Sequence, residues 1–155
     1  MRQDTHRLAH GRYRPSLDDH AEDEAEVQAV LEALATAVTT GNGDGAAECW
    51  AVPAFVIGDE HEQAVSSLAG VAQFFGGARE LYNARGIGDT RPELQALDWL
   101  GESMALVEVR WPWLDAQGEE AGSETSTYLF KRDRSGELKL RVAMLHGAQP
   151  GRAHS

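Results

Sequence analysis

The sequence is short of positive charge. Its 155 residues include 14 Lys and Arg against 25 Asp and Glu, which leaves a formal net charge of −11 at pH 7. Nucleic acids and anionic membrane surfaces are bound by clustered Lys and Arg. We therefore expect neither nucleic acid nor a membrane as a partner.

Cysteine and long apolar runs are also scarce. The single cysteine, Cys49, cannot form an internal disulfide, which favours a reducing compartment. No apolar run approaches the roughly 20 residues that a membrane-spanning helix requires. The N-terminus is charged and has no apolar core of the kind found in secretory signals, so we expect a cytoplasmic protein.

The length and the hydrophobic content of 42% are typical of one folded domain with a substantial core. Residues 1–20 show no apolar periodicity and are expected to form a flexible N-terminal arm. We expect the folded domain to occupy residues 21–148 and a C-terminal tail to occupy residues 149–155.

The clearest helix signal covers residues 22–40. Apolar residues recur there at the spacing of one helix face: Val27, Val30, Leu31, Leu34 and Val38. Gly41 is suited to the left-handed conformation that ends many helices. The pattern predicts an amphipathic helix packed against the core.

Residues 104–147 predict three consecutive antiparallel strands. The first alternates strictly, with one apolar face made of Ala105, Val107, Val109, Trp111 and Trp113. A polar loop precedes a second strand at residues 125–132, and a turn that ends at Gly136 precedes the third. The same alternation assigns one face of the third strand to Leu138, Leu140, Val142, Met144 and His146.

Between these two regions the pattern predicts shorter elements. We expect a short helix over residues 45–52 with Trp50 as a packing anchor, strands at 54–58 and 63–67, a helix over 68–85, and a strand at 94–100. Gly76 and Gly77 interrupt the longer helix and predict a kink or a close backbone approach. Segregated helices and an antiparallel sheet make the expected fold α+β.

The order of these elements and several local phrases resemble the NTF2-like superfamily, in particular its SnoaL-like and ketosteroid-isomerase-like branches. The phrases are Thr39-Thr40-Gly41-Asn42, Trp50-Ala51-Val52-Pro53-Ala54-Phe55-Val56-Ile57, Leu68-Ala69-Gly70-Val71-Ala72-Gln73-Phe74-Phe75, Met104-Ala105-Leu106-Val107 and Thr127-Tyr128-Leu129-Phe130. The resemblance implies a cone-shaped, strongly bent antiparallel sheet wrapped around helices (an α+β barrel) with an apolar pocket. It also implies a homodimer formed through the outer face of the sheet. The superfamily contains isomerases, hydrolases, cyclases, dehydratases and proteins without chemistry, so it leaves the activity open.

Two residues are candidates for acid–base catalysis. The alternation of the last strand predicts that His146 faces the cone interior, where a neutral imidazole could act as a base. The resemblance implies a carboxylate base just after the first strand, and Asp59 lies within a residue of that place. The structural alternatives are a strand-end histidine bound to a backbone carbonyl, and a solvated hairpin tip at Asp59.

Aromatic and apolar residues are expected to line the pocket. They are Trp50, Phe55, Phe74, Tyr82, Trp99, Trp111, Trp113 and Met144. We expect no cofactor and no metal. The leading hypothesis is a SnoaL-like protein that binds a small, largely apolar molecule, with or without acid–base isomerisation, cyclisation or hydrolysis. The alternatives are a non-catalytic dimeric binding or accessory module whose cone is filled by side chains, and a subunit that uses its sheet face on another protein.

Overall fold

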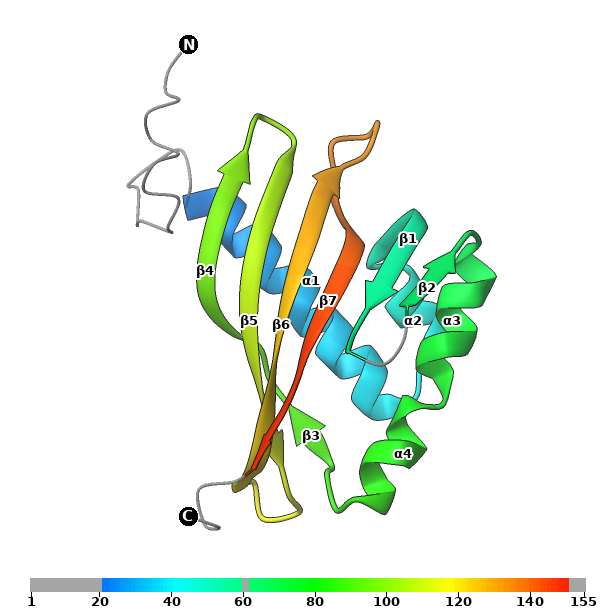
Figure 1. Ribbon diagram of the computed structural model, residues 1–155, viewed down its shortest axis with the longest axis vertical. Coiled ribbons are helices and arrows are strands. Elements are labelled where there is room, and N and C mark those ends of the chain that lie inside the picture. Colours follow the sequence, from blue (N-terminus) through cyan, green and yellow to red (C-terminus); the bar gives the residue numbers. More distant parts are fainter. Residues whose placement is uncertain (1–20, 60–61, 151–155) are drawn as a thin grey trace.

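A long first helix lies across one face of a curled sheet in the computed structural model of this protein, which describes residues 21–59 and 62–150 (Figure 1). The arm expected at residues 1–20 and residues 151–155 of the expected tail lie outside the described residues. The helices are α1 (Ala21–Thr40), α2 (Gly43–Ala47), α3 (Leu68–Gly76) and α4 (Ala78–Ala84). The strands are β1 (Trp50–Ile57), β2 (Glu62–Val65), β3 (Asp89–Thr90), β4 (Glu93–Leu100), β5 (Met104–Leu114), β6 (Glu120–Arg132) and β7 (Leu138–Pro150).

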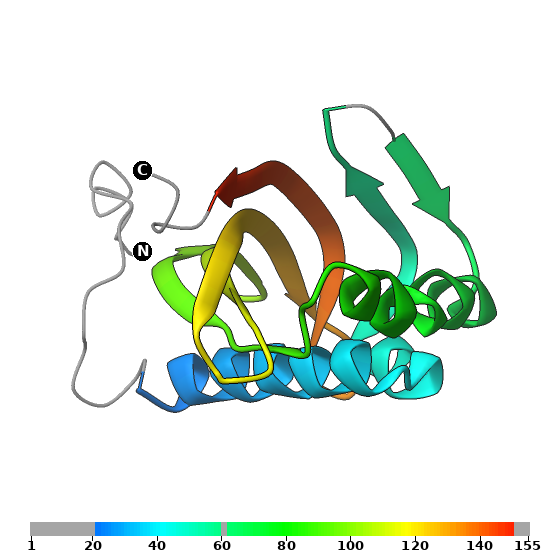
Figure 2. The same cartoon turned by 90° about the horizontal axis from the view of Figure 1, so that it is seen from below.

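The strands form one sheet in the order β2-β1-β7-β6-β5-β3, and β4 pairs with β5 beside β3. Every pair is antiparallel except β1 with β7, which is parallel. Seen from below, the long strands curl over α1, and α3 and α4 lie beside the C-terminal half of α1 (Figure 2). The predicted fold class, an α+β fold with a strongly bent sheet around helices, is confirmed.

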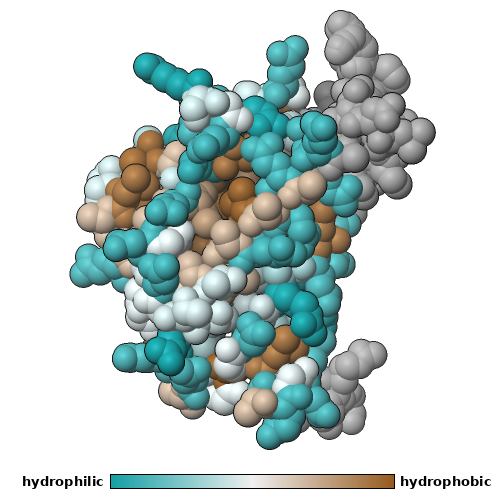
Figure 3. Space-filling view, turned by 180° about the vertical axis from the view of Figure 1, so that it is seen from behind, coloured by the Kyte–Doolittle hydropathy of each residue, from teal (hydrophilic) through white to brown (hydrophobic). Residues whose placement is uncertain are grey.

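Helix α1 supplies the helical side of the core. Val27, Leu31 and Leu34 of the predicted stripe are buried against the concave face of the sheet. The opposite side of α1 is exposed. Seen from behind, most of the molecular surface is hydrophilic, and hydrophobic side chains occupy separate areas (Figure 3). None of the described helices is long and apolar enough to cross a membrane.

Two similar turns join the long strands. In each, an aspartate carboxylate accepts hydrogen bonds from backbone N–H groups two and four residues ahead: Asp115 from Gln117 and Glu119, and Asp133 from Ser135 and Glu137. The glycine in each turn has positive φ, 79° at Gly118 and 90° at Gly136. These local bonds fix where β6 begins and ends.

The helix predicted over residues 68–85 divides at Gly77 into α3 and α4. The break is a kink, and a Cβ on Gly76 or Gly77 would meet nothing within 4 Å. The backbone of Gly76 nevertheless lies close to α2, since a Cβ on Gly43 would be 3.3 Å from the Gly76 Cα. The close approach is at Gly43, where a Cβ would lie 2.2 Å from the carbonyl oxygen of Ala72. Helix α2 therefore packs against α3, and α4, which follows α3, packs against α1.

The short helix predicted over residues 45–52 is shorter and earlier, because Trp50 already begins β1. The strand then alternates, with Ala54 and Val56 buried, while Phe55 on the opposite side is 45% exposed. Trp50 therefore enters the core from a strand end.

The predicted facing of the last strand is correct only for its first half. Between the pairs Phe130–Leu140 and Leu129–Val142 the register shifts by one residue, a β-bulge at Arg141. A bulge reverses the alternation beyond it. Leu138 and Leu140 face the interior as expected. After the bulge the interior positions are Ala143 and Leu145, so Val142, Met144 and His146 face outward.

Candidate functional site

A cavity of about 390 Å³ lies between the concave face of the sheet and the helices. Residues from the helices and from the sheet line it. Apolar side chains make up most of the lining: Leu34, Ala35, Val38, Trp50, Val56, Phe74, Phe75, Ala78, Leu81, Ile87, Trp111, Trp113, Ala143 and Leu145. At the rim, Leu81 of α4 is 70% exposed and Phe74 of α3 is 39% exposed, so apolar surface continues to the opening.

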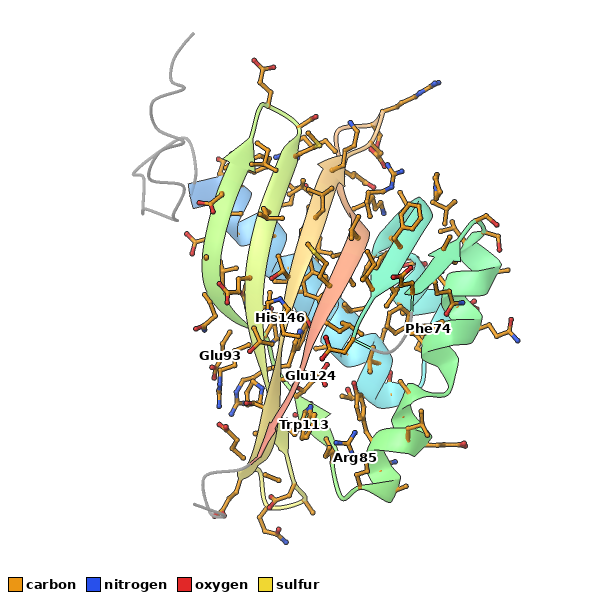
Figure 4. The ribbon with its side chains drawn as sticks, viewed as in Figure 1. Phe74, Arg85, Glu93, Trp113, Glu124 and His146 are labelled. Carbon is orange, nitrogen blue, oxygen red and sulfur yellow. The ribbon has the colours of Figure 1, made fainter. Side chains whose placement is uncertain are left out.

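Five polar residues also line the cavity: Tyr82, Arg85, Thr90, Glu124 and Tyr128. They come from α4 and the turn after it, from β3 and from β6. Figure 4 shows Glu124, Trp113 and Arg85 gathered near the lower end of the sheet, and Phe74 on α3 at its right. The arrangement is that of an apolar pocket with a few converging polar groups.

Glu124 is the one carboxylate in this lining. It is half-buried, and burial raises the pKa of its carboxyl group above the ordinary value, while the positive charge of Arg85 opposes the rise. A carboxyl group in such surroundings holds a proton at higher pH than a solvated one. Glu124 can therefore give or take a proton, or bind a donor, inside the cavity.

The two tyrosines of the lining are hydroxyl donors at neutral pH. Burial raises the pKa of Tyr82 to about 12, and the charge of Glu124 adds to the rise. Burial also raises the pKa of Tyr128, whose hydroxyl oxygen accepts a hydrogen bond of 3.0 Å from Nε1 of Trp111. That bond orients the two rings edge to face at the cavity wall, with ring centroids 6.3 Å apart.

Arg85 follows α4 and supplies the positive charge at the cavity. Its guanidinium carbon lies 4.5 Å from the centre of the Trp113 ring, within the range of a cation–π contact. The Arg85 side chain is exposed, so its charge is largely hydrated. The hydroxyl of Thr90 already has a hydrogen-bond partner, because it donates to the carbonyl of Pro112 at 2.7 Å. This bond fixes β3 against β5.

The structure places five of the predicted pocket residues in this cavity: Trp50, Phe74, Tyr82, Trp111 and Trp113. The other three lie outside its lining. Phe55 points outward from β1, and Met144 is turned outward by the bulge in β7. Trp99 lies on β4 beneath Arg132, whose guanidinium carbon is 5.6 Å from its ring centre, and it does not line the cavity.

The two predicted catalytic residues are not brought together at the cavity. The expectation that His146 faces the interior is wrong, because the bulge turns it to the outer face, where it is exposed and its Nε2 lies 2.7 Å from Oγ1 of Thr127. Asp59 is exposed just beyond β1 and is not part of the cavity lining. The adjoining residues 60–61 lie outside the described residues.

Sequence reasoning missed Glu124 and Arg85. Glu124 precedes the strand predicted at 125–132, but β6 begins at Glu120. Counting back in twos from the buried Phe130 and Tyr128 reaches Glu124, so the alternation held the signal once the strand was extended. Arg85 lies beyond a helix end, where no periodicity applies.

In residues 21–59 and 62–150, no group of three or more His, Cys, Asp or Glu side chains is arranged to hold a metal ion.

Comparison with known proteins gives a consistent family. The model of the family described as NTF2-like protein (DUF6841) matches residues 23–148. A search of curated proteins found no match.

Solved structures share the fold at low sequence identity. A domain of unknown function with a cystatin-like fold from Nostoc punctiforme has a TM-score of 0.64 at 16% identity, over 81% of this chain and 77% of that one. A ketosteroid isomerase-like protein from Erwinia carotovora atroseptica has a TM-score of 0.59 at 14% identity, over 81% and 96%. A protein from Catenulispora acidiphila, solved in complex with S-DNPA, has a TM-score of 0.60 at 13% identity, over 81% and 93%.

Identities this low show the common fold and not a common activity. The family match, in contrast, covers most of the chain and all but the first residues of α1 and the last of β7. The protein belongs to the NTF2-like family.

Proposed function

We propose that this protein binds a small, largely apolar molecule in the cavity between the curled sheet and α4. The observation that carries the proposal is the cavity itself, because a volume of about 390 Å³ lies within the range of small-molecule sites. A cone filled by its own side chains, as in the non-catalytic alternative, would leave no such space. The SnoaL-like resemblance supports the same type of function.

A fluorescent-probe titration tests this proposal. The probe is N-phenyl-1-naphthylamine, an apolar dye without charge at pH 8 whose emission rises in apolar surroundings. We expect saturable binding of one dye per chain. Ala78→Phe places a ring in the cavity and should abolish binding, whereas Ala69→Phe makes the same change at an exposed position of α3 and should not. Equal binding by both variants would contradict the proposal.

Acid–base catalysis is a second candidate, favoured by the raised pKa of Glu124 and the nearby hydroxyl groups of Tyr82 and Tyr128. A carboxyl group tuned toward neutral pH and flanked by hydroxyl donors suits proton transfer on a bound molecule. Ligands that displace the dye would be incubated with the protein and recovered. Conversion that disappears in Glu124→Gln would support catalysis, and unchanged recovery of every ligand would leave binding alone.

We further propose a cytoplasmic homodimer formed through the outer face of the sheet. That face is not covered by the helices, and it exposes Phe55 and Ile57 at 45% and 41%. Leu129 and Val142 extend the apolar surface on β6 and β7. Light scattering should give twice the chain mass, and Ile57→Lys should reduce it. A monomer in the unmodified protein would contradict this part of the proposal.

A further inference from the structure

Glu124 is half-buried, like Asp23 and Glu26 of α1, but its surroundings differ from theirs. Asp23 and Glu26 both pair with Arg132. Within the part of the chain that the structure describes, no hydrogen bond or ion pair reaches the carboxylate of Glu124, and Arg85 acts on it only through space. Its oxygens are therefore available to a molecule in the cavity.

A carboxylate in this position loses hydration without gaining a partner. Removing a charged group from water is costly unless an opposite charge or hydrogen-bond donors replace the water. Among the described residues that line the cavity, the exposed Arg85 is the source of opposite charge, and none of the lining groups donates a hydrogen bond to Glu124. A ligand with a positively charged donor would supply both the charge and the hydrogen bond, and charge-assisted bonds of this kind are about twice as strong as neutral ones.

The aromatic lining is suited to the same type of group. The rings of Trp111, Trp113 and Tyr82 surround the cavity, and the faces of such rings attract cations. Arg85 already lies over Trp113, which shows that a cation is accommodated at this wall. The net charge of −11 also favours the approach of cations over anions.

The competing possibility is an acidic ligand held by Arg85. Arg85 is exposed, so its attraction for an anion is screened by water and salt. Glu124 is half-buried, where the effective dielectric is lower and a charge acts more strongly. An acid head group at Arg85 would also lie near the like charge of Glu124. The balance favours a cation.

We propose that the molecule bound in this cavity is an apolar amine whose ammonium group donates to the carboxylate of Glu124, while its body packs against the aromatic wall. The proposal rests on the proposed binding function and deepens it by naming the head group of the ligand. In this proposal, Glu124 selects the ligand by its positive charge.

Three matched probes test the head group. 2-Phenylethylamine, 2-phenylethanol and 3-phenylpropionate share a phenyl ring and a two-carbon chain, and carry an ammonium, a hydroxyl or a carboxylate group at pH 8. Their dissociation constants would be measured from shifts of the tryptophan indole N–H resonances by NMR. We expect the amine to bind about tenfold more tightly than the alcohol, and the carboxylate to bind most weakly.

Two variants separate a local contact from general charge attraction. Glu124→Gln should bring amine binding down to the level of the alcohol and leave alcohol binding unchanged. Glu93→Gln removes the same charge from an exposed residue that pairs with Arg110, and should leave the amine preference intact. Figure 4 shows Glu93 on the side of the sheet away from α3 and α4.

The outcomes distinguish this proposal from the proposed function. Equal binding of amine and alcohol to the unmodified protein, or tightest binding of 3-phenylpropionate with loss in Arg85→Gln, would overturn the amine proposal and keep the binding cavity. Dye binding without binding of any of the three probes would overturn it as well. Absence of binding by the dye and by all three probes would overturn both.

Discussion

The indole N–H of Trp111 donates to the hydroxyl oxygen of Tyr128 at 3.0 Å, between neighbouring strands and at the wall of the cavity. Tyr128→Phe keeps the ring but leaves the buried N–H without its acceptor. An unpaired buried polar group costs about 1–3 kcal/mol, so we expect a loss of unfolding free energy of that size in urea denaturation. The matched control is Tyr82→Phe, because no hydrogen bond to the Tyr82 hydroxyl is found among the described residues. Similar losses for both variants would contradict the role given to this bond.

The raised pKa of Glu124 leads us to expect an unusual dependence of folding stability on pH. Because its pKa is raised on folding, protonation favours the folded state, and this contribution is lost as the pH rises through the folded pKa. Glu124→Gln removes the titrating group and keeps the side-chain shape. We expect the variant to gain stability over the unmodified protein at pH 7.5, and the difference to shrink as the pH falls toward 4.

Thermal unfolding at a series of pH values measures this difference. Glu93→Gln is the control, since it removes an exposed carboxylate that pairs with Arg110 and should bring no gain at pH 7.5. A gain in Glu124→Gln that is as large at pH 4 as at pH 7.5 would show that the effect does not come from titration of Glu124.

Cys49 is expected to be chemically inert in the folded protein. It is buried, and burial raises the pKa of its thiol to about 11. The reactive species is the thiolate, so disulfide exchange with Ellman's reagent at pH 8 should be on the order of 100-fold slower in the native state than in denaturant. Comparable rates in the two states would mean that the thiol is accessible in the native fold.

From the contact between α2 and α3 we expect Gly→Ala substitutions at two positions to change stability in opposite directions. Gly43→Ala puts a methyl group 2.2 Å from the carbonyl oxygen of Ala72, and we expect a loss of about 1–3 kcal/mol. Gly76→Ala meets nothing within 4 Å in a helix, where Ala is favoured over Gly by up to about 1 kcal/mol. Chemical denaturation of both variants checks the pair. A tolerated Gly43→Ala would show that α2 and α3 are not in this contact.

The sequence predicted the architecture more closely than the site. The stripe on α1 and the alternation along β5 came from simple periods, because each of these elements buries one continuous face. Their place in the fold was confirmed. The break at Gly77 was anticipated from the two glycines, though the sequence did not say whether they served a kink or a contact.

The site was harder to predict because it depends on irregularities. The bulge at Arg141 reverses which side chains of β7 face the interior, so Leu145 faces the cavity and His146 faces outward. The hydrophobic periodicity of one sequence does not reveal a bulge, because the bulge is specified by the pairing of β7 with β6 and β1. Arg85 reaches the cavity from an irregular segment, and only tertiary structure brings it near Glu124.

The proposed function requires that a small molecule binds in the cavity between the sheet and α4. The four tryptophan indole N–H resonances test this directly by NMR, because Trp50, Trp111 and Trp113 line the cavity and Trp99 does not. On saturation with N-phenyl-1-naphthylamine we expect the first three resonances to shift and that of Trp99 to stay in place. No shift in any resonance at saturating dye, or a shift of Trp99 alone, would contradict the account.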